Sequence, residues 1–139
     1  MPRFNRTTLL IAAIPVILLI AVLMRPDQQV GGSGQPIVRV TVPTLSAVAK
    51  TGETLFNANC ATCHGANAAG QEGIAPPLIH KIYEPGHHSD ISFHRAAKYG
   101  VRAHHWRFGN MPPVPGITTS EVNKVIAYVR ELQRANGIN

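Results

Sequence analysis

Two cysteines and a histidine stand together near the middle of the chain, in the run Cys60-Ala61-Thr62-Cys63-His64. A Cys-x-x-Cys pair is compatible with a redox dithiol, half of a zinc site or covalent haem attachment, and the histidine that follows favours haem. The chain has only two cysteines and no βαβ context, which argues against a four-cysteine zinc site and a thioredoxin-like dithiol. Two thiols at this spacing can add to the two vinyl groups of one porphyrin. We therefore predict one haem c per chain, attached to Cys60 and Cys63, with His64 as an iron ligand.

An iron held by His64 needs a second protein ligand unless it is to bind a small molecule. The other two methionines precede the expected domain, so Met111 is the candidate. It lies in Gly109-Asn110-Met111-Pro112-Pro113, where two prolines stiffen the chain. A thioether is a soft, neutral ligand that raises the reduction potential, although methionine is also common core filler. Met111 is therefore predicted to be the second axial ligand.

The elements that position these residues are predicted to be helices joined by loops. Ser46 can cap a helix that ends near Asn59, and Ser89 can cap a second one. Thr118 and Glu121 form a capping box before a third helix, whose apolar residues recur at helical spacing: Val122, Val125, Ile126, Val129 and Leu132. No strand pattern follows residue 46, so the domain is expected to be all-α.

The N-terminal segment contains an uncharged run of eighteen residues, 7–24. As a helix it would span about 27 Å, close to the thickness of a thin bilayer. Arg3 and Arg6 precede the run and only Arg25 follows it directly, so the positive-inside rule predicts a cytoplasmic N-terminus. A cleaved signal peptide is the alternative, but the run ends in Val22-Leu23-Met24 rather than in small residues. We predict an uncleaved single-pass anchor over 1–25 in a bacterial inner membrane, with the remainder periplasmic.

Residues 26–45 have the composition of a flexible linker, with Gly31-Gly32-Ser33-Gly34 followed by Pro36 and Pro43. The stretch 37–42 alternates like a strand but has no obvious partner. The predicted organisation is thus an anchor over 1–25, a linker over 26–45 and a haem domain over 46–139.

The formal charge of +6 does not predict a nucleic-acid partner. Arg3, Arg6, Arg25 and Arg39 against Asp27 place +3 of it before residue 46. The remaining charges form no tight run, so no nucleic-acid footprint is present.

Six histidines fall between residues 78 and 107: His80, His87, His88, His94, His104 and His105. Clustered imidazoles are common copper or zinc ligands, which makes His87, His88, His104 and His105 candidates for a second metal. Against this, no pair has the spacing of a known metal motif, and neighbouring histidines on a regular element point apart. The alternatives are solvated loop residues or contacts to haem propionates. His104 or His105 is also an alternative to Met111 as axial ligand.

Over roughly residues 46–136 the chain resembles the class I cytochrome c family. The resemblance is carried by Cys60-Ala61-Thr62-Cys63-His64-Gly65, by Pro76-Pro77-Leu78, by Met111-Pro112-Pro113 and by a closing helix with Tyr128. It implies an all-α domain of three or more helices around one covalent haem, in which the first and last helices cross. Gly52 and Phe56 would meet Tyr128 at that crossing, and the carbonyl of Pro76 would accept a hydrogen bond from His64.

The predicted function is one-electron transfer rather than catalysis on a small-molecule substrate. The partners would be redox proteins, either as a shuttle between respiratory donors and an oxidase or as the haem subunit of an oxidoreductase. A metal-handling or sensing protein that uses the histidine-rich region 80–105 is the alternative.

Overall fold

The computed structural model describes residues 34–139, so the expected anchor over 1–25 lies outside the described residues. Within the described range no helix is long and apolar enough to cross a membrane. The elements are α2 (Ala47–Asn59), α3 (Ala61–His64), η1 (Ala66–Ala68), η2 (Lys81–Tyr83), α4 (Asp90–Tyr99) and α5 (Thr119–Ala135). In residues 34–139 there are no strands, only isolated bridges at Gln71–Ala75 and Val101–Met111. The prediction of an all-α domain is therefore confirmed for this part of the chain.

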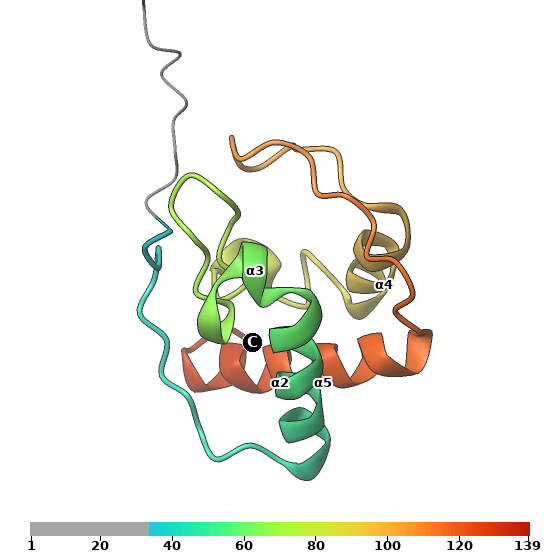
Figure 1. Ribbon diagram of the computed structural model, residues 1–139. Coiled ribbons are helices and arrows are strands. Elements are labelled where there is room, and N and C mark those ends of the chain that lie inside the picture. The colour runs from blue at the N-terminus through green and yellow to red at the C-terminus, as the bar shows by residue number, and fades with distance from the viewer. Residues whose placement is uncertain (1–33) are drawn as a thin grey trace, which may run out of the picture. The chain divides into compact units, whose positions relative to one another are not determined.

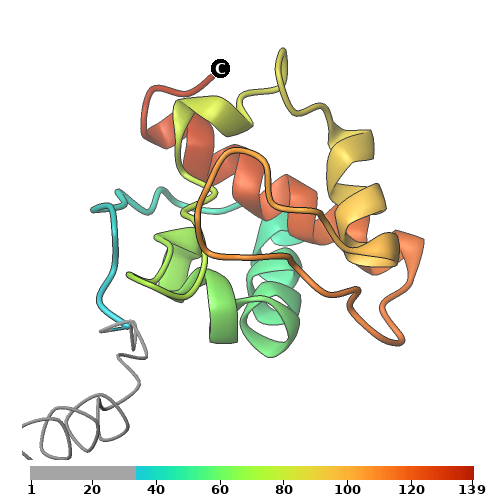
Figure 2. The same ribbon diagram turned by 90° about the horizontal axis from the view of Figure 1, so that it is seen from above.

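Helices α2 and α5 cross at the centre of the domain, as Figures 1 and 2 show. The rings of Phe56 and Tyr128 meet there, with centroids 5.5 Å apart. Gly52 allows the close approach, since a Cβ on it would lie 1.9 Å from the carbonyl oxygen of Lys124. The core around the crossing comprises Ala49, Phe56, Ala68, Ile79, Val125, Tyr128, Val129 and Leu132. The predicted crossing of the first and last helices is present.

The helix starts follow from local capping chemistry. Ser46 caps α2, where its Oγ accepts a hydrogen bond from the backbone N–H of Ala49 at 3.3 Å. Thr118 and Glu121 form the predicted capping box at the start of α5. Ser89 occupies the N-cap position of α4 but its side chain makes no capping hydrogen bond. The predicted first residues of all three helices are therefore correct, and only the side-chain capping hydrogen bond expected from Ser89 is missing.

Residues 34–45, the described part of the expected flexible linker, are held against the domain. The backbone N–H groups of Ile37 and Val38 both donate to the carbonyl of Ala69 at 3.1 Å. Thr41 and Asn136 exchange two hydrogen bonds, of 2.9 and 2.8 Å. Alternate side chains of this stretch pack on the core: Val38 and Val40, with Leu45 further on. The expectation of a free tether was wrong here, because the apolar alternation at 37–42 finds its partner on the domain surface.

Glu131 joins the start of α2 to α5 and makes one pH-dependent contribution to stability. Its carboxylate accepts hydrogen bonds from Ser46 Oγ at 2.7 Å and from the Ser46 backbone N–H at 3.0 Å. These bonds, the hydroxyl first, hold the pKa of Glu131 below its ordinary 4.5. Because the folded pKa is depressed, the stabilisation is complete above the unfolded pKa and disappears as pH falls through the folded one.

We therefore expect Glu131→Gln to reduce the free energy of unfolding at neutral pH but not at strongly acidic pH. Solvent screening of this exposed group keeps the difference below about 1 kcal/mol. Denaturant unfolding of both proteins across pH measures it, and Ser46→Ala should remove the larger part of the same pH dependence, because the backbone N–H of residue 46 still donates to Glu131. A difference that stays constant across pH would contradict the assignment.

Candidate cofactor site

A cavity of about 560 Å³ lies beside the α2–α5 crossing. Its lining brings together the residues predicted to act on a haem: Cys60, Cys63, His64 and Met111. Much of the remaining wall is apolar and comes from α2, α4, α5 and the intervening loops, including Phe56, Ile74, Leu78, Phe93, Val101 and Val122. A concave, mostly apolar wall with a few convergent polar groups is typical of a cofactor site.

Cys60 immediately precedes α3, and Cys63 lies within it. Cys60 is half-buried, Cys63 is exposed, and they do not form a disulfide. Burial, followed by the charge of Cys63, raises the pKa of Cys60 to about 11. Redox dithiols work through a thiol whose pKa is lowered. The environment of Cys60 therefore argues against a dithiol oxidoreductase.

His64 is held in a defined orientation. Its side chain is 8% exposed, and its Nδ1 donates to the carbonyl of Pro76 at 2.9 Å. The hydrogen bond fixes the tautomer and leaves Nε2 with the lone pair that a metal requires. Burial lowers the pKa of His64, and the Pro76 carbonyl offsets part of that decrease. The lowered pKa favours the neutral imidazole, which is the protonation state of a metal ligand.

Gln71 stabilises the turn that carries these three residues, and sequence reasoning missed it. Its Nε2 lies 3.1, 2.7 and 3.1 Å from the carbonyl oxygens of Ala61, Thr62 and Cys63. In a helix of only four residues most carbonyls have no partner within the helix; the Ala61 carbonyl accepts from the Gly65 N–H at 2.9 Å, and Gln71 adds a donor for all three. An isolated glutamine in a loop gives no sequence signal for this role.

Met111 is placed by backbone pairing rather than by the helices. Val101 and Met111 exchange two N–H···O=C hydrogen bonds of 2.9 Å. Gly100 precedes this pair with a φ of 74°, and a Cβ there would lie 2.4 Å from the carbonyl oxygen of Met111. The pairing returns the chain after α4 along the cavity wall, and Met111 is one of the residues that line the cavity.

Trp106 supplies a test of whether the residues present fit a haem. Its Nε1 is buried and makes no hydrogen bond of good geometry with residues 34–139. The Tyr83 hydroxyl is its polar neighbour: burial raises the pKa of that hydroxyl, and a loose side-chain hydrogen bond with the indole offsets part of the rise. A buried donor left so poorly paired loses part of the about 1–3 kcal/mol that an unmatched donor costs, so a ligand acceptor at this site would stabilise it. Trp106 lines the cavity, and the propionates of a haem are suitable acceptors, so the residues fit the group.

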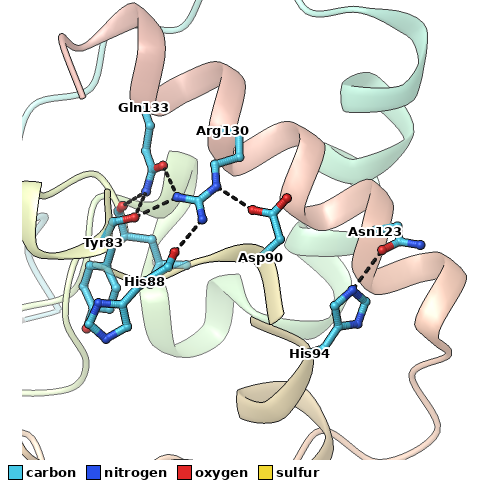
Figure 3. Close-up of polar contacts among 8 residues, drawn as sticks. Tyr83, His88, Asp90, His94, Asn123, Arg130 and Gln133 are labelled. Carbon is cyan, nitrogen blue, oxygen red and sulfur yellow. Dashed lines mark hydrogen bonds and ion pairs between the residues drawn. The ribbon is translucent and has the colours of Figure 1, made fainter. Parts of the chain in front are cut away.

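Arg130 and Gln133 on α5 are buried and form a polar network with the loop before α4 (Figure 3). The guanidinium of Arg130 donates to the carboxylate of Asp90 at 2.9 Å and to the carbonyls of Tyr83 and His88 at 2.8 and 2.6 Å. Gln133 accepts a further bond from Arg130 at 2.6 Å. Sequence reasoning missed both residues. Their burial could have been predicted from the helical pattern of α5, because each lies one turn after an apolar core residue.

The histidines separate into two sets. His94 lies apart and contacts Asn123 at 2.9 Å (Figure 3), and His80 caps η2 through its Nδ1. The others gather in the loops before α4 and after Val101, with ring centroids 4.8 Å apart for His87–His88 and 4.1 Å for His104–His105. The argument that neighbouring histidines on a regular element point apart does not apply to these pairs, because both lie in loops.

Comparison with known proteins places the domain in a family. Residues 49–133, which are more than half of the chain, match the family model for cytochrome c. The chain belongs to the cytochrome c family, whose members bind haem c covalently, and the Cys60-Ala61-Thr62-Cys63-His64 run has the form of that attachment site.

Two kinds of curated relatives match part of this domain. The chain is 36% identical over 86 residues to the Cbb3-type cytochrome c oxidase subunit CcoP of Rubrivivax gelatinosus, covering 60% of this chain and 26% of that protein. It is 38% identical over 64 residues to the cytochrome bc1 complex cytochrome c subunit of Mycobacterium bovis, covering 46% and 23%. The chain thus spans about a quarter of the length of these relatives. No solved structure matches it significantly.

Proposed function

We propose that this protein is a mono-haem c-type cytochrome that carries single electrons, with Cys60 and Cys63 as attachment sites and His64 and Met111 as axial ligands. The observation that carries the proposal is the convergence of these four residues on one largely apolar cavity. When bound, haem c supplies a reversible one-electron iron couple. The chain's own residues bind, orient and desolvate this group.

Each residue contributes a separable effect. The Pro76 carbonyl aims the His64 ring and increases its basicity as a ligand. The Met111 thioether stabilises ferrous iron and so sets a high potential, as expected of a carrier that accepts electrons from respiratory donors. The apolar wall excludes water, and the buried indole N–H of Trp106 is available to a propionate.

The partners that we propose are respiratory redox proteins. The relatives are named as subunits of an oxidase and of a bc1 complex, which supports this assignment. We propose that the segment 1–25 anchors the domain on the periplasmic face of a bacterial inner membrane. There the domain would pass electrons between respiratory donors and an oxidase, as a shuttle or as a haem subunit, without a small-molecule substrate or nucleic acid of its own.

The test is haem attachment in the full chain, produced together with haem-maturation machinery. We expect one haem per chain that stays bound after denaturation, and complete loss of this covalent haem in a Cys60→Ala/Cys63→Ala variant. Thr62→Ser, an exposed position between the cysteines, is the matched control and should keep the haem. Haem-stained denaturing gels and optical spectra provide the readout.

The coordination state is measured on the same preparation. A six-coordinate, low-spin haem whose reduced form resists carbon monoxide supports the carrier. A reduced form that binds carbon monoxide readily would overturn the proposed second ligand and favour a sensing role. Recovery of the full chain with the membrane fraction checks the anchor.

A further inference from the structure

Three histidines from two separate loops converge beside the cofactor cavity: His87, His88 and His105. One ring nitrogen from each lies within 4.8 Å of those of the other two. We propose that these residues form a three-histidine site for a divalent transition-metal ion of the zinc class, distinct from the haem iron. Electron transfer by one haem requires no second metal ion, so this site goes beyond the proposed function.

The distances suit such an ion. His87 Nε2 and His105 Nε2 are 3.4 Å apart. Two imidazoles on one tetrahedral zinc, each at about 2.0–2.1 Å, place their nitrogens about 3.3–3.4 Å from each other. Two ring nitrogens at this separation usually share a proton in a hydrogen bond, which accounts for two nitrogens only. A third ring nitrogen, from His88, also lies within 4.8 Å of both, and this favours a metal cation.

His88 is oriented as a metal ligand would be. Its Nδ1 donates to the carbonyl of Ile82 at 2.6 Å, which leaves Nε2 with a free lone pair. The backbone of the same residue is fixed from α5, since Arg130 donates to the His88 carbonyl at 2.6 Å (Figure 3). Metal-binding histidines commonly have such a carbonyl partner on the far ring nitrogen.

The charged side chain nearest His88 does not prevent a cation from binding. Arg130, which would repel a cation, is paired with Asp90 at 2.9 Å.

His104 is a neighbour of the site rather than one of its three ligands. Its ring nitrogens are not among the three that converge within 4.8 Å. Its ring is tilted against that of His105, with centroids 4.1 Å apart, and its Nδ1 donates to the carbonyl of Arg102 at 2.8 Å. The fourth position of a tetrahedral ion is therefore left to water or another small ligand, as in zinc sites with three protein ligands.

The experiment uses the full haem-loaded protein without a histidine tag. Zn²⁺ is titrated against a chromophoric competitor, and Cu²⁺ serves as a paramagnetic probe whose spectrum counts coordinated nitrogens. We expect one Zn²⁺ per chain, at least about tenfold weaker binding in His87→Ala and in His105→Ala, and three nitrogen ligands on Cu²⁺. His94→Ala, outside the cluster, is the matched control and should bind like wild type.

The haem spectrum of each variant separates this proposal from the proposed function, because an intact spectrum shows that the domain and its haem site are preserved. Equal Zn²⁺ affinity in wild type, His87→Ala and His105→Ala would overturn the site. A changed haem spectrum or potential in these variants with unchanged Zn²⁺ affinity would also overturn it, since the histidines would then act on the haem propionates.

Discussion

Gly52→Ala is expected to destabilise the haem domain by about 3 kcal/mol or more, the upper range for overpacking. The added Cβ would lie 1.9 Å from the carbonyl oxygen of Lys124 and 2.6 Å from its carbon. Both atoms belong to the backbone of α5 and cannot rotate away, so the two helices must separate. Alanine is the better helix former by about 1 kcal/mol, which offsets only part of the loss. Separation would also weaken the Phe56–Tyr128 contact at the crossing.

Denaturant unfolding of the haem-loaded protein measures this effect. Gly86→Ala is the matched control, because a Cβ on Gly86 meets nothing within 4 Å. Its free energy of unfolding should stay within about 0.5 kcal/mol of wild type. If the Gly52 variant yields no folded protein, the amount of covalent haem recovered per cell supplies the comparison. Equal behaviour of the two variants would show that the helices do not cross this closely.

Met111→Ala is expected to lower the reduction potential on the order of 0.1 V or more, within the ~0.8 V range that axial ligands span. Sulfur is a soft, neutral donor that stabilises ferrous iron, and water in its place favours the ferric state. The weak long-wavelength absorption of ferric iron bound to methionine sulfur should disappear, and the reduced protein should begin to bind carbon monoxide. Spectroelectrochemical titration and optical spectra measure these changes.

Met111→Leu distinguishes the ligand role from packing, because it keeps a similar apolar volume without the sulfur. It should reproduce the fall in potential while retaining more stability than the alanine variant. Retention of the wild-type potential in Met111→Leu, with its loss in His104→Ala or His105→Ala, would assign the axial position to a histidine. Both histidines border the cavity, so the comparison addresses a real alternative.

Most of the helix starts could be predicted from sequence because capping acts over three or four residues. The hydroxyl of Ser46 and the box formed by Thr118 and Glu121 need only their own first turn. The chemistry of Cys60 to His64 is similarly local, since five consecutive residues carry it.

Two further features were predictable only through the family resemblance. The crossing of Gly52 with α5 and the bond from His64 to Pro76 join residues that no local pattern connects. Their presence shows that the resemblance extends to contacts outside the haem motif.

Residue types, spacing and caps, all of which are local, were thus enough to determine from sequence alone the all-α class, the helix starts and the attachment motif. Tertiary structure decided the burial of Arg130 and Gln133, the packing of residues 34–45 and the meeting of His87 with His105. The physical reason is that these contacts join segments far apart in the chain. Their formation depends on the summed packing of the whole domain, whereas a cap or a haem motif depends only on its neighbours.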